Sequence, residues 1–389
     1  MPWRTTTDRT EKPRAMMSAF FWVFLALSAG FWLASWTVFL RLRSVPSVAG
    51  GSDATVPPLE SGISLIIPAR NEEENLATLL PSIAEQDPPP LEIIVVDDHS
   101  ADATASVARD HGATVLASEA LPEGWYGKPW ALVQGARAAK GEWLLFLDAD
   151  TALESGGLTR LAALTVAKDT VFSACPWHRI EKPFEELCAF FNVIMLAGTN
   201  AFTWRGFDTE PIALFGQAML VRKRDYERVG THGRVKAVVL ENLHLARHFE
   251  ELGIRCRSYL GKGTLRMRMF PGGYAEMEKS WAKGFLSGAG NTPRGALIGV
   301  SLWLSALIMA TIALTFLPLA GEAVRIAVAG FYLVCAGQCA YLFRKAGRFS
   351  PLNALFFPVS LIYYQWLFFL SAHRRRKGLT TDWKGRDVH

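Results

Sequence analysis

Two aspartates close an apolar stretch in FLDADT (146–151), and their spacing is the strongest chemical signal in the sequence. An ionised carboxylate is costly to bury unless a cation, hydrogen-bond donors or water accompany it. Side chains two positions apart in a strand point to the same side, so Asp148 and Asp150 are expected to face one ligand together. Mg²⁺ or Mn²⁺ is commonly held by one or two carboxylates while substrate phosphates complete its shell. The pair therefore predicts a cation site that joins the protein to a phosphate-bearing ligand.

Two further polar clusters follow apolar runs earlier in the chain. PARNEEEN (68–75) follows ISLII, and DDHS (97–100) follows LEIIVV. The first turn is crowded with side chains and lacks the GxGxxG of dinucleotide enzymes, and no GxxxxGK[ST] phosphate loop occurs. A nucleotide diphosphate bridged by the cation fits better, with Asp98 at the base edge, Glu72 at the ribose hydroxyls and Lys128 of EGWYGKPW against the diphosphate. An isolated DxD is usually a solvated loop, but this one follows a buried strand and faces DDHS.

The elements that must position these residues alternate along the chain. Strands are predicted at 63–68, 91–98, 113–118 and over EWLLFLDAD, and helices at 103–109, 130–139 and across NEEENLATLLPSIAEQ, where Leu76, Leu79, Leu80 and Ile83 recur at helical spacing. Continuous apolar strands between helices indicate an α/β domain with a mostly parallel sheet covered on both faces. Right-handed crossovers then bring the carboxyl ends of the strands to one edge, where open α/β sheets bind ligands.

Long apolar segments flank this domain and predict an integral membrane protein. The chain is 50% hydrophobic and 20% charged, and the uncharged segment 18–40 is long enough to cross a bilayer. A cleaved signal peptide is the alternative, but the segment is too long and runs directly into Arg41 and Arg43. The expected order is a tail (1–17), a transmembrane anchor (18–40), a linker (41–60), the α/β domain (61–290), about three hydrophobic segments (296–372) and a basic tail (373–389).

Charge and cysteine content narrow the class of protein further. The net charge of +5 is concentrated beside the apolar segments, as in HRRRK (373–377), which indicates anchoring by the positive-inside rule and argues against nucleic-acid binding. Five cysteines form an odd set without a CxxC pair, which suits a reducing, cytosol-facing protein.

The motifs IIPARNEEENL, VVDDHSADAT, GWYGKPWAL and FLDADT together resemble the family 2 glycosyltransferases, GT-A enzymes that use nucleotide-sugars. The resemblance is greatest to the membrane-bound carotenoid-acid (4,4'-diaponeurosporenoate) glycosyltransferases, with hopanoid-associated enzymes next. It continues through PFEELCAFFNVIMLAGTNAF, LFGQAMLVRKRDY, KSWAKGFLSGAGNT and the terminal DWKGR, so it spans nearly the whole chain.

The resemblance implies a GT-A nucleotide-sugar-binding domain plus transmembrane helices, in a multi-pass protein of the cell membrane with the domain facing the cytoplasm. The implied reaction is inverting transfer of one sugar from a UDP-sugar, such as UDP-glucose, to a lipid acceptor such as a carotenoid acid, hopanoid or glycerolipid. It implies Mg²⁺ or Mn²⁺ at Asp150 and Asp148, and places Trp281 and Lys283 on the acceptor side. The implied donor-binding residues are Pro68, Ala69, Arg70, Glu72, Asp98, Lys128, Asp148 and Ala149.

Glu241 in VVLENLHLARHFEELG is the candidate general base. Many relatives carry a Glu-Asp pair here, whereas this chain has Asn242, which cannot take a proton. An acid acceptor would arrive ionised, and Glu241 would then orient it; an alcohol acceptor would need a base. Glu241 also shares a helix face with His244 and His248, but this spacing is not the HExxH of zinc sites.

Alternatives to single-sugar transfer are a processive polysaccharide synthase and an inactive lipid-binding or nucleotide-sugar-binding membrane protein. The chain lacks the QxxRW motif that is typical of such a synthase. An inactive binding protein would not need the DxD motif and Glu241, which are present.

Two expectations concern the membrane. The apolar segment 183–202, which contains Glu185, Glu186 and Asn192, is either an interfacial helix near the acceptor channel or a core helix. Three full spans after a cytosolic domain would place HRRRK outside, so the segment with Pro358 is the first candidate for a re-entrant or interfacial one.

Overall fold

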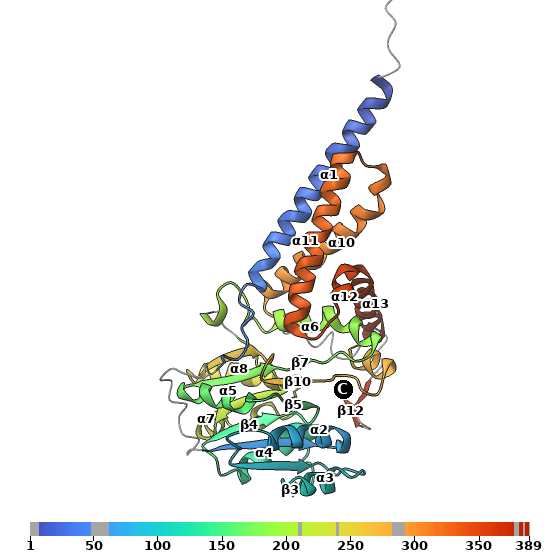
Figure 1. Cartoon of the computed structure of the whole chain (residues 1–389). Coiled ribbons are helices and arrows are strands. Elements are labelled where there is room, and N and C mark those ends of the chain that lie inside the picture. Colours follow the sequence, from blue (N-terminus) through green and yellow to red (C-terminus); the bar gives the residue numbers. More distant parts are fainter. Residues whose placement is uncertain are drawn as a thin grey trace, which may run out of the picture.

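The computed structural model describes residues 8–47, 62–208, 212–238, 241–281, 292–376, 381–383 and 386–388. An α/β domain forms one end of the molecule and long helices form the other (Figure 1).

A seven-stranded sheet forms the centre of the domain, in the order β3-β2-β1-β4-β8-β6-β9. Its strands are β1 (Ile63–Ala69), β2 (Glu92–Asp97), β3 (Thr114–Ala117), β4 (Trp143–Leu147), β6 (Thr170–Cys175), β8 (Ala218–Arg222) and β9 (Arg255–Leu260). The pairs β1–β2, β1–β4, β2–β3 and β6–β9 are parallel, whereas β8 runs antiparallel between β4 and β6. The expected mostly parallel α/β sheet is therefore confirmed.

Helices cover both faces of the sheet, and α2 shows how an apolar stripe at helical spacing directs one of them to the core. In α2 (Glu73–Ala84), Leu76, Leu79, Leu80 and Ile83 are all buried, as their spacing predicts. The other domain helices are α3 (Thr104–Asp110), α4 (Gly127–Ala138), α5 (Gly157–Ala163), α7 (Lys223–Arg228) and α8 (Glu241–Glu251), with short 3-10 turns η3 (Leu164–Val166), η5 (Gly206–Asp208) and η6 (His232–Val235). One buried cluster joins α2 and α5 to one face of the sheet.

A small second sheet lies at the carboxyl end of β4. It consists of β5 (Thr151–Leu153), β10 (Leu265–Met267) and β7 (Trp177–His178), with β10 in the middle. Because β5 begins directly after Asp150, this sheet fixes the direction in which the chain leaves the aspartate pair.

Three of the described helices are long and apolar enough to cross a membrane: Ser18–Val38, Arg294–Thr315 and Glu322–Ala346. They correspond to α1 (Asp8–Ser35) with η1 (Trp36–Val38), to α10 (Arg294–Thr315) and to α11 (Glu322–Ala346); η7 (Leu317–Leu319) joins the last two. Trp303 Nε1 donates to Gln338 Oε1 at 3.1 Å, and Gln338 Nε2 donates to Ser35 Oγ at 3.3 Å. This buried chain of hydrogen bonds connects all three helices, a common way to hold apolar helices in register.

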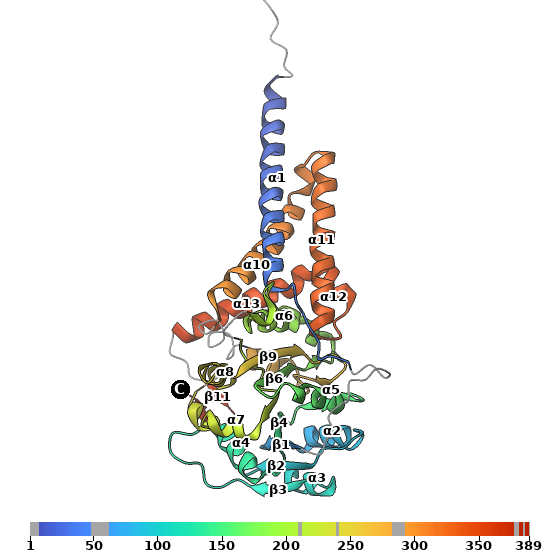
Figure 2. The ribbon, with the colours of Figure 1, turned by 90° about the vertical axis from the view of Figure 1, so that its left-hand side faces the viewer.

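The segment 183–202 lies between the domain and the long helices (Figures 1 and 2). It forms η4 (Pro183–Cys188) and α6 (Ala189–Gly198), and the side chains of Phe190, Phe191 and Asn192 are buried. A single buried cluster runs from the sheet through α6 into α10, α11 and α13 (Phe357–Arg376). The domain and the long helices therefore share one core, and α6 is part of it.

The ends of the chain differ in detail from the sequence-based expectations. α1 begins at Asp8, inside the expected tail 1–17. The start of the expected linker is held against the domain, because Val45 N donates to Leu260 O at 3.1 Å and Leu260 N donates to Arg43 O at 2.8 Å; residues 48–61 lie outside the described residues. The last apolar segment divides at Phe356 into α12 (Pro351–Leu355) and α13, and neither is among the three candidate spans. A short hairpin follows, β11 (Thr381–Trp383) with β12 (Arg386–Val388).

Candidate functional site

The turns after β1 and β2 interlock at the carboxyl edge of the sheet. Arg70 Nη1 lies 3.3 Å from the carbonyl oxygen of Asp98 and 3.5 Å from its carboxylate. Asn71 adopts a left-handed conformation (φ 55°), in which its amide oxygen accepts from Ala101 N at 2.8 Å. The carboxylate of Glu73 accepts from Ala103 N at 2.8 Å. Several polar groups of PARNEEEN thus hold the neighbouring turn in place, and Arg70 and Asp98 lie at the carboxyl edge of the sheet.

The turn after β4 presents the aspartate pair. Asp148 N donates to Gln217 O at 3.0 Å, and Thr151 Oγ1 donates back to Asp148 O at 2.7 Å. The chain therefore makes a tight turn between β4 and β5 that contains both aspartates, and Ala149 between them is buried.

Lys128, at the start of α4, lies between two acids. Its Nζ is 2.6 Å from Asp148 Oδ1 and 4.0 Å from Glu241 Oε1. Burial opposes the charge on Lys128, but the neighbouring carboxylates, Asp148 first and Glu241 second, raise the pKa of its ammonium above the usual value. The lysine is therefore a fixed cation that links the DxD turn to α8.

Asp150 is the least satisfied carboxylate of the site. Its Oδ1 is buried and has no hydrogen-bond partner among the residues that the structure describes. Burial and then the charge of Asp148 raise its pKa to about 7. Two oxygen ligands one residue apart, one of them without a partner, fit a divalent cation that prefers oxygen. The described residues contain no group of three or more His, Cys, Asp or Glu side chains suited to a metal, so a ligand would have to complete the shell.

Glu241 begins α8 and is held by its neighbour. Asn242 Nδ2 donates to Glu241 Oε1 at 2.9 Å. A Cβ at Gly216 would lie 2.4 Å from Asn242 Nδ2, so glycine is needed there to leave room for this amide. The asparagine that departs from the common Glu-Asp pattern therefore orients the glutamate. His248, on the same helix, pairs with Glu251 at 3.0 Å.

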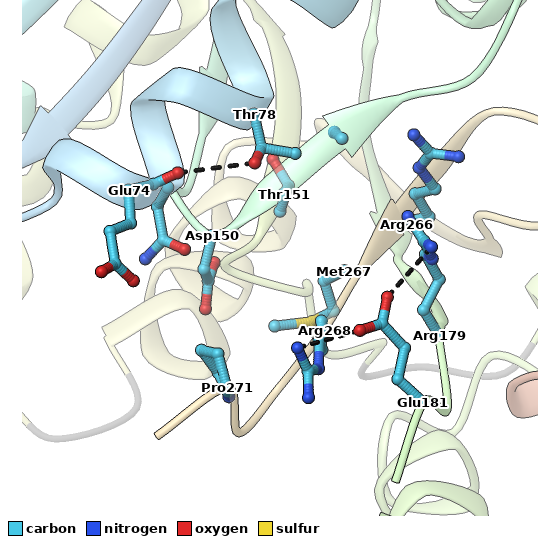
Figure 3. A pocket seen from close by; sticks show the side chains of 12 residues that line it. Glu74, Thr78, Asp150, Thr151, Arg179, Glu181, Arg266, Met267, Arg268 and Pro271 are labelled. Atoms are coloured by element: carbon cyan, nitrogen blue, oxygen red, sulfur yellow. Dashed lines mark hydrogen bonds and ion pairs between the residues drawn. The ribbon is translucent and has the colours of Figure 1, made fainter. Parts of the chain in front are cut away.

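A cavity of about 300 Å³ opens beside Asp150 (Figure 3). It is lined by Glu74, Asn75, Thr78, Asp150, Thr151, Ala152, Arg179, Glu181, Arg266, Met267, Arg268 and Pro271. Asp150 lies on the side formed by α2 and β5, and three arginines that follow or belong to β7 and β10 lie on the other. We call Arg179, Arg266 and Arg268 the arginine wall. Asp148, Lys128 and Glu241 are not among the lining residues, so of the two aspartates only Asp150 borders the cavity.

The comparisons with known proteins agree with this geometry. The family model described as "Glycosyl transferase family 2" matches residues 64–229. The chain is 31% identical over 329 residues to the 4,4'-diaponeurosporenoate glycosyltransferase of Staphylococcus aureus (strain USA300), covering 83% of this chain and 87% of that protein. The chain belongs to glycosyl transferase family 2. The counterpart from strain MRSA252 is 30% identical over the same length.

A solved structure of the same fold is the mannosyltransferase PcManGT from Pyrobaculum calidifontis, described in complex with GDP-Man and Mn²⁺. It is 20% identical with a TM-score of 0.50, over 86% of this chain and 98% of that one. The chain is therefore a family 2 glycosyltransferase with a GT-A-like domain, as its motifs predict.

Trp281, which was expected on the acceptor side, is not among the residues that line the cavity. Trp281 stacks on Phe191 (centroids 4.6 Å apart), and its Nε1 donates to Cys188 Sγ at 3.4 Å, which places it in the core beside α6. Lys283 lies outside the described residues.

The arginine wall was not predicted from the sequence. The one available signal is LRMRM (265–269), in which two arginines stand two positions apart in a short strand and therefore share a side. Arg179 gives no such signal, because it reaches the cavity only through the pairing of β7 with β10.

Proposed function

We propose that this family 2 glycosyltransferase transfers one sugar from a nucleotide diphosphate sugar, a UDP-sugar such as UDP-glucose, to a lipid acceptor drawn from the membrane. The observation that carries the proposal is the cavity beside Asp150. One side of it is the DxD turn, and the other is anchored to η4, whose continuation α6 packs against the long apolar helices. A polar donor site and a membrane-derived acceptor can meet there.

The donor is assigned to the carboxyl edge of the sheet. Asp98 and Arg70 bind the base, and Glu72 binds the ribose. The backbone of Pro68, Ala69 and Ala149 lines the donor site. Lys128 neutralises the diphosphate. Asp148 and Asp150 hold Mg²⁺ or Mn²⁺, which when bound supplies Lewis-acid stabilisation of the leaving diphosphate. Lys128 then exchanges part of its contact with Asp148 for the phosphate oxygens.

The acceptor is assigned to the cavity beside Asp150. The curated relative is named for a carotenoid acid, and a carotenoid acid, hopanoid or glycerolipid would reach the cavity from the bilayer. Glu241 takes the proton of an alcohol acceptor or orients an acid one. Because nucleotide-sugars are made in the cytosol, the domain faces the cytoplasm of a multi-pass protein of the cell membrane.

The test uses purified protein in nanodiscs with Mg²⁺ or Mn²⁺, a panel of UDP-sugars and GDP-mannose, and extracted lipids. Mass spectrometry is expected to show a lipid heavier by one sugar, and Asp150→Ala is expected to abolish it. Arg255→Gln, an exposed position at the far edge strand, is the matched control and should retain activity. A ladder of masses would instead indicate a processive synthase. Donor binding without transfer to any lipid would indicate a binding protein.

A further inference from the structure

Arg266 is an arginine without a counter-charge. Glu181 is held by both other members of the wall, Arg179 at 3.0 Å and Arg268 at 2.9 Å, and Glu185 accepts from Arg268 Nε at 3.0 Å. Within the described part of the chain, the side chain of Arg266 has no ion pair and no hydrogen bond, although it lines the cavity. A guanidinium in this state offers a forked pair of donors to an anion.

Unpartnered buried polar atoms gather behind this wall. Some atoms are buried and have no hydrogen-bond partner in the described part of the chain: both ring nitrogens of His178, both amide atoms of Asn192 and Nη2 of Arg268. His178 is 2% exposed and Asn192 is 1% exposed. Both line a second, smaller cavity of about 10 Å³, which shares Arg179 with the first. Buried polar groups are normally paired, so a concentration of unpaired ones marks the place of a polar ligand or of water.

This second cavity lies between the arginine wall and the segment formed by η4 and α6. It is also lined by Cys188, Met269 and Phe270, and Asn192 lies on α6. A row of aromatic rings lies beside this segment. The ring centroids of Phe191 and Tyr363 of α13 are 6.1 Å apart, and those of Tyr363 and Tyr274 are 6.2 Å apart. An apolar chain with a polar end could therefore lie along these rings with its end at the wall.

We propose that the arginine wall binds the carboxylate of an acid lipid acceptor, with Arg266 as its principal partner. The inference rests on the proposed transfer of a sugar to a lipid and names the class of acceptor. A single negative charge is balanced by Arg266, the one guanidinium of the wall that has no ion pair among the described residues. A phosphate dianion would add uncompensated charge beside Asp150, Glu181 and Glu74.

The chemistry of the transfer balances without a base. A carboxylate oxygen forms a bond to the anomeric carbon, the bond from that carbon to the diphosphate oxygen breaks, and its electron pair leaves with the nucleoside diphosphate. The product is a glycosyl ester. No proton moves, because a carboxylic acid with a pKa of about 4–5 is already ionised at neutral pH.

The experiment measures binding of a matched pair of polyene probes, all-trans-retinoic acid and all-trans-retinol, to the protein in nanodiscs. Wild type should bind the acid at least about 10-fold more tightly than the alcohol. Arg266→Gln should weaken acid binding about 10- to 100-fold, the usual loss for a hydrogen bond to a charged group, and leave retinol binding unchanged. Arg266→Lys should retain part of the affinity, and the matched control Arg255→Gln all of it.

Three results with the acceptor probes would overturn the inference. The first is equal binding of acid and alcohol by wild type, and the second is an equal loss of affinity for both probes in Arg266→Gln. The third is displacement of retinoic acid by farnesyl phosphate at a concentration about 10-fold lower than by farnesoic acid. Titration with UDP-glucose in the same samples separates donor effects. A matching loss of donor affinity in Arg266→Gln would assign Arg266 to the diphosphate and also overturn the inference. Because these readouts are binding constants, they stand even if no sugar is transferred, which alone would contradict the proposed function.

Discussion

At the scale of single residues, the ionised carboxylate of Asp150 is energetically unfavourable in the folded protein. Its carboxyl has one buried oxygen without a partner and lies beside Asp148, so its pKa is raised to about 7 from 3.8. Between these two values the folded protein binds more protons than the unfolded chain. The contribution of this group to the free energy of unfolding therefore falls as pH rises through that window, and the cost is fully present above pH 7.

Asp150→Asn should consequently stabilise the metal-free protein while abolishing transfer. At about pH 8 with a chelator, we expect the free energy of unfolding to rise by roughly 1–3 kcal/mol, which differential scanning fluorimetry would detect as a higher Tm. Near pH 4 the difference should vanish. Added Mn²⁺ should raise the Tm of wild type and leave that of the variant unchanged. A variant less stable than wild type under chelation would contradict this reading of Asp150.

Glu241 gives a second prediction at this scale, which depends on the acceptor. Asn242 holds the carboxylate beside Lys128 and cannot itself take a proton. Glu241→Gln keeps the shape and should lower transfer to an alcohol lipid by about 10²–10⁴, the usual scale for a general base, but should be nearly silent with an acid lipid. Rates measured with a matched acid and alcohol would decide, and the reverse order would refute the assignment.

Among single residues, charged groups next to a recognisable strand end were the ones that could be predicted. The sequence alone indicated Asp148, Asp150 and Lys128, and the structure brings them together. Glu73, an acid of the same cluster that was given no role, holds the neighbouring turn. Arg266 was missed, because two arginines two positions apart in a three-residue strand are not distinguished by sequence from a pair that faces solvent.

At the scale of elements, the joint between η4 and α12 is fixed by polar contacts inside an apolar layer. Asn353 Nδ2 donates to the carbonyl and the carboxylate of Glu186, both at 2.8 Å, and Ser350 N donates to the same carboxylate at 2.9 Å. Burial raises the pKa of Glu186. The acids that seemed out of place in an apolar segment are therefore anchors: Glu185 holds the arginine wall, and Glu186 holds α12.

Asn353→Ala should loosen this joint. It leaves a half-buried carboxylate with fewer donors and removes the acceptor of Ser360 Oγ, so we expect a loss of about 1–3 kcal/mol and a Tm lower by several degrees. Leu352→Ala, at an exposed position on the same helix, is the control and should have little effect. Equal Tm values for wild type and Asn353→Ala would show that these hydrogen bonds contribute nothing to stability.

At the scale of the whole molecule, local pattern and distant pairing contributed differently to what the sequence could predict. The strands β1, β2 and β4 and the three candidate spans follow from runs of apolar residues, which are local properties. The insertion of β8 between β4 and β6 and the assembly of β5, β10 and β7 join segments far apart in the chain, and strands of two to five residues have no periodicity to announce them. The cavity is built by that second group, so the sequence could predict the donor edge but not the wall opposite it.

The arrangement of the long helices bears on the expected sidedness of the basic tail, because three full spans after a cytosolic domain would place HRRRK outside. In Figures 1 and 2, the connection between α10 and α11 points away from the sheet, whereas α13 lies at the end of the helices nearest the domain. If the three candidate spans cross the membrane and the domain faces the cytoplasm, α13 lies on the side of the domain, and the basic residues at its end satisfy the positive-inside rule. Single cysteines at exposed positions test this, because all five natural cysteines are buried. In intact cells, a membrane-impermeant maleimide should label Gly321→Cys at the α10–α11 connection. Lys140→Cys on the domain and His373→Cys near the end of α13 should react only after permeabilisation. Labelling of His373→Cys together with Gly321→Cys would mean that α13 crosses the membrane, and labelling of Lys140→Cys in intact cells would place the domain outside, away from the nucleotide-sugar pool.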